Sequence, residues 1–185
     1  MDSVANGPFN ALHDTASGEM QGIGLTMEGI EQNPVMYNLM LENVWRESPV
    51  DLNTWLPEYA LRRYGKKNVA AEKAWNILRY SAYTDSITNG GAESIITARP
   101  TFTKNPGGHY TTKLPYAPME LVKAWDELID AADELKNSDG YQFDVVDVTR
   151  QVLANYALDI QQQIAQDYKK KDLDAFRKTV INSSL

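Results

Sequence analysis

The sequence contains no cysteine and only two histidines among its 185 residues. Without cysteine the chain has no disulfide, no thiolate metal site and no cysteine nucleophile. His13 and His109 are far apart in the sequence and share no spacing typical of metal ligands, so we expect both to be surface or turn residues. The sequence also lacks a GxGxxG fingerprint and a Walker motif, which excludes the common phosphate-binding loops.

Long apolar runs and an excess of basic residues are missing as well. No apolar run approaches the roughly 20 residues that a membrane-spanning helix requires, so we expect no membrane partner. The 25 acidic residues exceed the 18 basic ones, and the formal net charge is −7. This balance argues against a nucleic acid as main partner, because its phosphates attract clustered Lys and Arg. With 43% hydrophobic residues, the composition is that of an ordinary globular protein.

The first 19 residues predict a polar loop. The Asn-Gly-Pro sequence at residues 6–8 is typical of turns, and the segment has neither the basic nor the apolar region of a signal peptide. Met20–Thr26 is short, apolar and interrupted by Gly22 and Gly24, which predicts a short buried strand. We therefore expect a chain that opens in a loop and is a piece of a larger protein.

From residue 33 onward, apolar residues recur mainly at helical spacing. Asn33 and Pro34 are the residue types of an N-cap and a first helical position, and they predict a helix that ends near Trp45. Residues 85–116 lack such a pattern, so they are either a functional connection or a plain surface loop. Further helices are expected from Asp51 to Gly65, from about Ala70 to Thr84, from Pro118 to a break at Asp139-Gly140, from Phe143 to about Lys171, and after Asp172.

Pro57 conflicts with the helix expected after Asp51. An interior proline costs a helix about 3 kcal/mol. If Asn53 caps the helix, Pro57 falls in the first turn and most of that cost disappears. Gly65, which follows two arginines, is expected to end the helix in a left-handed conformation.

Few side chains stand out as candidates for chemistry. Trp55, Trp75 and Trp125 suit stacking on sugar rings, but they lie in amphipathic helix patterns, and core packing is the favoured interpretation. Asp144 and Asp147 are spaced i, i+3 on a predicted helix. We interpret such a pair as a solvated helix face rather than a metal site.

Glu28 is different because it follows the predicted strand and precedes the helix capped by Asn33. In parallel α/β architectures catalytic groups lie at the carboxyl ends of strands. Glu28 is therefore a candidate nucleophile or acid/base. The alternative is that Glu28 or Glu31 only supplies negative charge to a helix N-terminus.

Five sequence segments, in chain order, carry a family resemblance. They resemble segments of the α-N-acetylglucosaminidase family of glycoside hydrolases, and the likeness covers nearly the whole chain. It implies a mainly α fold, in which residues 1–45 are the last βα unit of a truncated TIM-like barrel and residues 46–185 are the front part of an all-helical C-terminal domain. The segments are SVANGP (3–8), GIGLTMEGIEQNPV (22–35), DLNTWLPEYALRRYG (51–65), AWNIL (74–78) and YQFDVVDVTRQ (141–151).

The resemblance also implies an activity. Glu28 matches the nucleophile of a retaining exo-α-N-acetylglucosaminidase, which would act on glycans that end in α-linked N-acetylglucosamine. Retaining enzymes use two carboxyl groups about 5–5.5 Å apart, and this pair requires no metal or organic cofactor. The family's acid/base lies on an earlier barrel strand, upstream of residue 1, so we expect the chain alone to be inactive. Family members are mostly lysosomal, periplasmic or secreted, and the resemblance implies such a compartment for this protein.

A second interpretation is a stand-alone helical module that binds a glycan or a protein without chemistry. The predicted strand discriminates between the two, because Met20–Leu25 has no sheet partner within the sequence. Its backbone N–H and C=O groups would then be unpaired in a self-contained module. Such a strand is natural in a fragment of a barrel.

Overall fold

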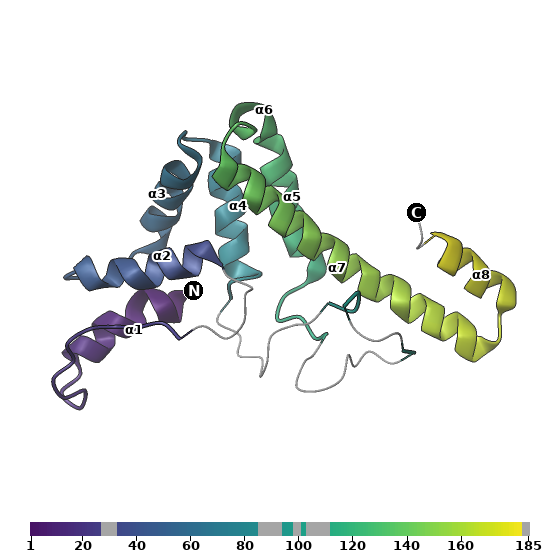
Figure 1. The fold of residues 1–185 in the computed structure, drawn as a ribbon, viewed down its shortest axis with the longest axis horizontal. Helices are drawn as coiled ribbons and strands as arrows, with labels where there is room; N and C mark the ends of the chain where they lie inside the picture. Colours follow the sequence, from purple (N-terminus) through teal and green to yellow (C-terminus); the bar gives the residue numbers. More distant parts are fainter. Residues whose placement is uncertain (27–32, 85–93, 98–100, 103–111, 183–185) are drawn as a thin grey trace.

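A computed structural model describes residues 1–26, 33–84, 94–97, 101–102 and 112–182. This described part is helical and contains no strand, so the mainly α fold is confirmed (Figure 1). The elements are α1 (Asp2–His13), α2 (Pro34–Glu42), the 3-10 helix η1 (Asn43–Trp45), α3 (Leu52–Tyr64), α4 (Val69–Tyr80), α5 (Pro118–Asp130), α6 (Ala132–Leu135), α7 (Asp139–Lys170) and α8 (Leu173–Asn182).

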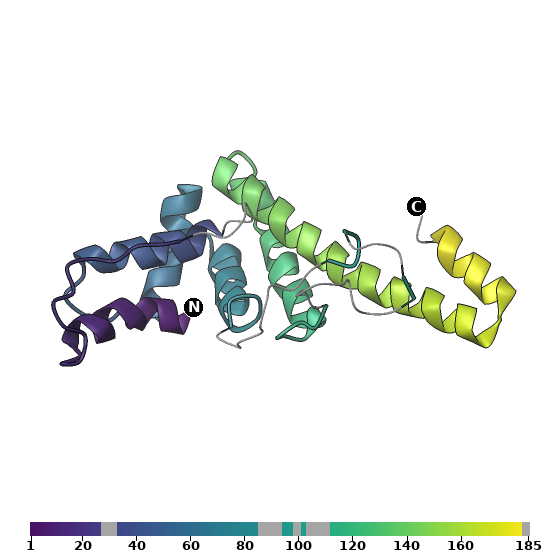
Figure 2. The same cartoon turned by 60° about the horizontal axis from the view of Figure 1, so that its bottom comes forward.

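Helices α1 and α2 lie side by side at one end of the molecule (Figures 1 and 2). The prediction of a polar loop over the first 19 residues is wrong, because α1 forms despite Pro8 in its interior. Pro8 has no N–H to offer the carbonyl of Val4. The side-chain amide of Asn43, in η1, donates to that carbonyl at 3.2 Å. A tertiary hydrogen bond therefore replaces the local one that proline removes.

Residues 20–26 do not form the predicted strand. A strand requires a ladder partner, and no described segment pairs with this one. Gly22 and Gly24 lie in open space, since a Cβ added to either would meet no atom within 4 Å. A hollow of about 160 Å³ separates residues 20–23 from α1 and η1. The segment therefore lies loosely against its neighbours.

The caps of α3 differ from the prediction at one end and confirm it at the other. Asp51 is the N-cap, and its carboxylate accepts from the backbone N–H of Asn53 at 3.0 Å. Pro57 thus lies in the second turn and removes an intrahelical bond, so the condition for a low cost, a cap at Asn53, is not met. Gly65 ends the helix at φ 74°, in the left-handed conformation that glycine adopts without strain.

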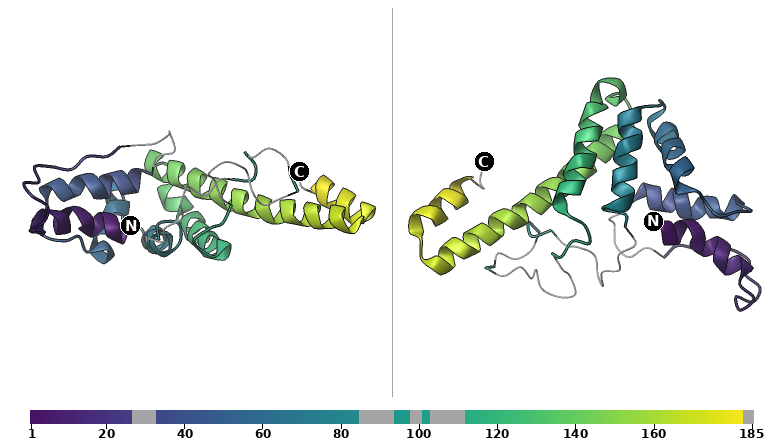
Figure 3. Two further views of the ribbon diagram at one scale, coloured as in Figure 1. Left: turned by 90° about the horizontal axis from the view of Figure 1, so that it is seen from below. Right: turned by 180° about the vertical axis from the view of Figure 1, so that it is seen from behind.

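Helices α3, α4, α5 and the first half of α7 pack into a bundle that contains most of the core (Figures 1 and 3). Trp55 and Trp75 are buried and Trp125 is partly buried, which confirms the core interpretation of the three tryptophans. The bundle core is built from Leu52, Trp55, Leu56, Tyr59, Tyr64, Ala74, Trp75, Leu78, Leu121, Leu128, Leu135 and Tyr141.

The long helix α7 begins at Asp139, four residues before the predicted start, so the sequence at 139–140 opens this helix. Gly140 fits there because a Cβ would lie 2.6 Å from the carbonyl oxygen of Arg63. Helix α7 spans 32 residues and is about 48 Å long. Its second half extends away from the bundle, and α8 folds back along it (Figure 3). Thr179 holds α8 by donating to the buried carboxylate of Asp167 at 3.0 Å.

Candidate functional site

Glu28, like Glu31, lies outside the described residues, so the site is defined here by the elements that flank it. The chain is described up to Thr26 and again from Asn33. Asn33 is the N-cap of α2 and Pro34 its first residue, as predicted. The position of α2 therefore fixes where the segment that carries Glu28 must end.

The N-terminal end of α2 is tied to the turn after α4. The hydroxyl of Tyr83 donates to the side-chain oxygen of Asn33 at 3.0 Å. The Tyr83 ring stacks on the buried indole of Trp75 with ring centroids 6.2 Å apart, and its backbone N–H donates to the carbonyl of Leu78 at 2.9 Å. Burial raises the pKa of the Tyr83 hydroxyl, so the group stays protonated and keeps the proton that it donates to Asn33.

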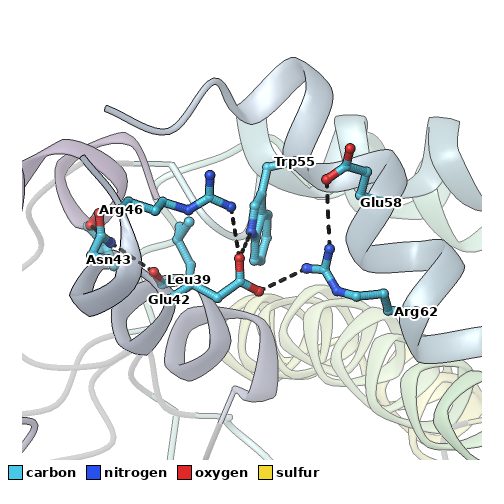
Figure 4. A network of polar contacts seen from close by, with 8 residues as sticks. Leu39, Glu42, Asn43, Arg46, Trp55, Glu58 and Arg62 are labelled. Atoms are coloured by element: carbon cyan, nitrogen blue, oxygen red, sulfur yellow. Dashed lines mark hydrogen bonds and ion pairs between the residues drawn. The ribbon is translucent and has the colours of Figure 1, made fainter. Parts of the chain in front are cut away.

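The C-terminal end of α2 is tied to α3 by Glu42, the last helical residue. The indole Nε1 of Trp55 donates to Oε2 of Glu42 at 2.6 Å, and Nη2 of Arg62 donates to Oε1 at 2.9 Å. Arg46 adds a bond at 3.0 Å from the turn after η1. Figure 4 shows the carboxylate of Glu42 between these three donors, with Glu58 on the far side of Arg62. One carboxylate thus connects α2, α3 and the intervening turn.

The environment of Glu42 keeps it charged. Partial burial opposes ionisation, but hydrogen bonds from Trp55 and Arg46 and the charge of Arg62 outweigh it and lower the pKa of the carboxyl. Charge-assisted hydrogen bonds are about twice as strong as neutral ones. Glu42 is therefore an anionic anchor at physiological pH.

A row of aromatic rings connects the two anchors through the bundle core. Trp55 stacks on Tyr59 at 5.1 Å between centroids, and Tyr59 meets Trp75 edge to face at 5.0 Å. Trp75 in turn stacks on Tyr83. Contacts of this kind add about 0.5–1.5 kcal/mol each beyond the burial of area. The two anchors of α2 therefore belong to one packed unit of the helical bundle.

A third link joins α1 to the bundle. Arg79, in α4, forms an ion pair with Asp2 of α1, and its Nη1 donates to the side chain of Asn53 in α3 at 3.0 Å. Hydrogen bonding to Asp2, against some desolvation, raises the pKa of Arg79, which stays charged in any case. Both N-terminal helices are thus held by polar contacts to α3 and α4.

A buried polar network between α3, α4 and α7 also supports the bundle. Asp144, 7% exposed on α7, accepts two hydrogen bonds from Arg63 and one from Tyr64 at 2.9 Å. The Tyr64 hydroxyl accepts from the indole of Trp75 at 2.8 Å. The interpretation of Asp144 as part of a solvated face is wrong. Asp147, by contrast, is half-exposed and pairs with Arg150 on its own helix, as expected for a solvated face.

The other predicted residues show no chemistry in the described part of the chain. His13 is exposed on α1, where its ring stacks on Phe9, and His109 lies outside the described residues. No group of His, Asp and Glu suited to a metal ion occurs among the described residues. Within the same residues, no helix is both long and apolar enough to cross a bilayer.

Comparison with known proteins gives the family. Residues 55–183 match the family model described as the alpha-N-acetylglucosaminidase (NAGLU) C-terminal domain, and residues 1–47 match the NAGLU TIM-barrel domain. The chain belongs to the α-N-acetylglucosaminidase family. Its N-terminal helices thus correspond to a short part of the family's barrel, and its helical bundle corresponds to the C-terminal domain.

Relatives within the α-N-acetylglucosaminidase family are much longer. The human alpha-N-acetylglucosaminidase is 32% identical over 176 residues, which are 94% of this chain and 23% of that protein. A family 89 glycoside hydrolase from Clostridium perfringens, solved with 2-acetamido-1,2-dideoxynojirmycin, is 34% identical with a TM-score of 0.88, over 96% of this chain and 20% of that one. A variant of the Clostridium enzyme with two glutamate-to-glutamine substitutions, solved with its substrate GlcNAc-alpha-1,4-galactose, is 33% identical with a TM-score of 0.89 over the same shares.

The anchors of α2 therefore cross between the two matched regions of the family. Asn33 and Glu42 lie in the barrel-matching part, whereas Tyr83 and Trp55 lie in the part that matches the helical domain. These contacts could not be predicted from the sequence, because nothing in the sequence around one residue of each pair indicates which residue it will contact. The burial of Asp144, by contrast, could have been predicted from its spacing. It lies three residues after Tyr141 and four before Val148, and both are buried on the same face of α7.

Proposed function

We propose that this chain is the part of a retaining exo-α-N-acetylglucosaminidase that carries the catalytic nucleophile, Glu28. The observation that supports the proposal most is the position of Glu28 in the barrel-matching region, just before the α2 helix that the helical domain holds at both ends. The printed substrate of the Clostridium relative, GlcNAc-alpha-1,4-galactose, supports glycans with terminal α-linked N-acetylglucosamine as the substrate class.

The stereochemistry of the substrate requires that an enzyme carboxylate act as the nucleophile. In an α-linked N-acetylglucosaminide the 2-acetamido group is on the same side of the ring as the leaving group, so it cannot attack from the opposite face. Glu28 would attack the anomeric carbon and displace the leaving oxygen, which a second carboxyl group protonates. Water, deprotonated by that second group, would then attack the β-linked glycosyl-enzyme and release the sugar with its α configuration retained.

The decisive experiment removes the carboxylate and replaces it with an external nucleophile. In the full-length protein, Glu28→Ala should lower kcat on an activated aryl α-N-acetylglucosaminide by several orders of magnitude. Added azide should restore turnover and give the β-glycosyl azide, because it attacks from the face that the carboxylate occupied. The matched control is Glu31→Gln, which should keep most of the activity.

Two results would contradict the assignment. Substantial turnover by Glu28→Ala without azide would remove Glu28 from the mechanism. Equal losses from the Glu28 and Glu31 variants, without azide rescue, would favour the alternative that both residues only supply charge to the N-terminus of α2.

The 185-residue chain alone should not hydrolyse the aryl substrate. It spans about a quarter or less of the relatives it matches, and retaining chemistry needs a second carboxyl group beside the nucleophile. Turnover by this chain alone would require an acid/base within residues 1–185. If the isolated chain bound N-acetylglucosamine without turning it over, the binding-module interpretation would apply to the fragment. The compartment we propose from the family resemblance is lysosomal, periplasmic or extracellular.

A further inference from the structure

Helix α2 is held at both ends by the helical domain, and the two anchors differ in chemistry. At the C-terminal end, the charged carboxylate of Glu42 accepts hydrogen bonds from three side chains. At the N-terminal end, the side chain of Asn33 accepts one from the Tyr83 hydroxyl. We propose that Tyr83 is a positioning residue of the glycosidase, which acts through Asn33 to fix the end of the segment that carries Glu28. This inference rests on the proposed function of Glu28.

The side chain of Asn33 is used for tertiary structure rather than for its own helix. An asparagine at the N-cap ordinarily accepts a hydrogen bond from the second or third backbone N–H of the helix. Here the side chain makes no cap bond, and only the backbone carbonyl of Asn33 accepts from Met36 at 3.0 Å. The side-chain oxygen accepts from Tyr83 instead. A local interaction is thus replaced by one that ties α2 to the helical domain.

The ring that carries the Tyr83 hydroxyl packs against the bundle core. Its ring stacks on Trp75, which is 2% exposed and donates its own N–H to Tyr64. The backbone of Tyr83 is bonded to Leu78, in the last turn of α4. Asn33 is therefore held against a group whose position is set by the core of the bundle, through two stacked rings.

The Tyr83 anchor acts at Asn33, the residue at which the segment that carries Glu28 ends. Val35 and Leu39 are buried in the core and hold the body of α2 together with Glu42, whereas Asn33 is exposed at the N-cap, where its side chain accepts from Tyr83. Glu28 precedes Asn33 by five residues, which span at most about 18 Å. A shift of Asn33 is therefore transmitted to Glu28 over a short length of chain. Misplacing a reacting group by about 1 Å can cost about 100-fold in rate.

The first experiment separates the rate from binding. In the full-length enzyme, Tyr83→Phe should lower kcat about 10-fold or more on the aryl α-N-acetylglucosaminide, with KM within about twofold, since it removes only the oxygen atom. The matched control is Tyr80→Phe, whose side chain is 64% exposed one turn earlier and should leave kcat unchanged. Asn33→Ala should reproduce the loss in kcat, whereas Asn33→Asp should retain activity because it keeps an acceptor. The double variant Tyr83→Phe/Asn33→Ala should lose no more than either single variant.

The second experiment separates positioning of the nucleophile from general support of the fold. In the Glu28→Ala background, azide replaces the carboxylate and is not attached to the chain. Adding Tyr83→Phe to Glu28→Ala should therefore leave the azide-dependent rate unchanged, although the same substitution slows the enzyme that retains Glu28. An equal loss in both backgrounds would assign Tyr83 a merely structural role and overturn the inference.

The remaining outcomes also decide between the two proposals. If Glu28→Ala abolishes turnover while Tyr83→Phe keeps full kcat, the nucleophile assignment stands and the positioning role is wrong. If Glu28→Ala remains active, both fail together. Should Tyr83→Phe not fold, Asn33→Ala carries the same comparison, because Asn33 makes no side-chain bond within α2.

Discussion

The guanidinium of Arg63 is joined to the carboxylate of Asp144 by two hydrogen bonds, from Nε at 2.6 Å and from Nη2 at 2.7 Å. Residues 81 positions apart thereby connect the C-terminal end of α3 to the first turns of α7. Burial raises the pKa of Asp144, although Arg63 and Tyr64 oppose the shift. The bidentate geometry is what makes an ion pair at a mostly buried position tolerable.

Breaking this pair should be costly. Asp144→Asn leaves the guanidinium of Arg63 without its counter-charge in a largely buried position, and we expect a loss of about 3–5 kcal/mol in the free energy of unfolding. Asp147→Asn, one turn away, disrupts only a half-exposed pair with Arg150 and should cost less than about 0.5 kcal/mol. Urea unfolding of both variants measures the difference, and equal values would show that Asp144 is solvated as the sequence suggested.

Two tyrosines of α3 should respond oppositely to loss of the hydroxyl. Tyr64→Phe removes a group that donates to Asp144 and accepts from Trp75, so the indole N–H is left unpaired and about 1–3 kcal/mol of stability is lost. Tyr59 is 1% exposed, and its hydroxyl has no hydrogen-bond partner among the described residues. Tyr59→Phe should therefore be neutral or stabilising by up to about 1 kcal/mol. Thermal unfolding compares the two, and a loss at Tyr59 would reveal a partner for its hydroxyl.

Two helical glycines should also differ. Gly140→Ala places a Cβ 2.6 Å from the carbonyl oxygen and 2.9 Å from Cγ of Arg63, and we expect a loss of about 1–3 kcal/mol as α3 and α7 separate. In α1, a Cβ at Gly7 meets no atom within 4 Å. Gly7→Ala should therefore stabilise α1 by about 0.5–1 kcal/mol, the ordinary gain from replacing glycine in a helix. Destabilisation by both substitutions would show that the space around α1 is filled in solution.

The Glu42 anchor should depend on pH. Because the folded-state pKa of Glu42 lies below its ordinary value of 4.5, its contribution is fully present above that value and is lost as pH falls through the folded pKa. We expect Glu42→Gln to cost about 1 kcal/mol at pH 7 and progressively less below about pH 4.5. Glu58→Gln, whose ion pair with Arg62 is exposed at 3.8 Å, should change little at either pH. A pH-independent cost of Glu42→Gln would mean that shape rather than charge holds α2.

The helices themselves could be predicted because their causes are local. The N-terminal signals at Asn33 and Pro34, the glycine that ends α3 and the start of α5 at Pro118 all depend on nearby residues. Helix α1 could not be predicted. Its proline needs a donor from Asn43, which lies 39 positions away from the Val4 carbonyl that it satisfies. The predicted strand at residues 20–26 failed for the converse reason, since a strand depends on a partner that the described chain does not provide.

The sequence by itself determined the helical periodicity and the resemblance to the family, and it singled out Glu28 as the candidate nucleophile. Only the tertiary structure decided which polar residues hold helix α2 in place. Asp144 and Asp147 look alike in the sequence, yet burial and Arg63 separate them, because the energy of a charge depends on what surrounds it. The bond between Tyr83 and Asn33 likewise exists only because packing brings two distant turns to 3.0 Å.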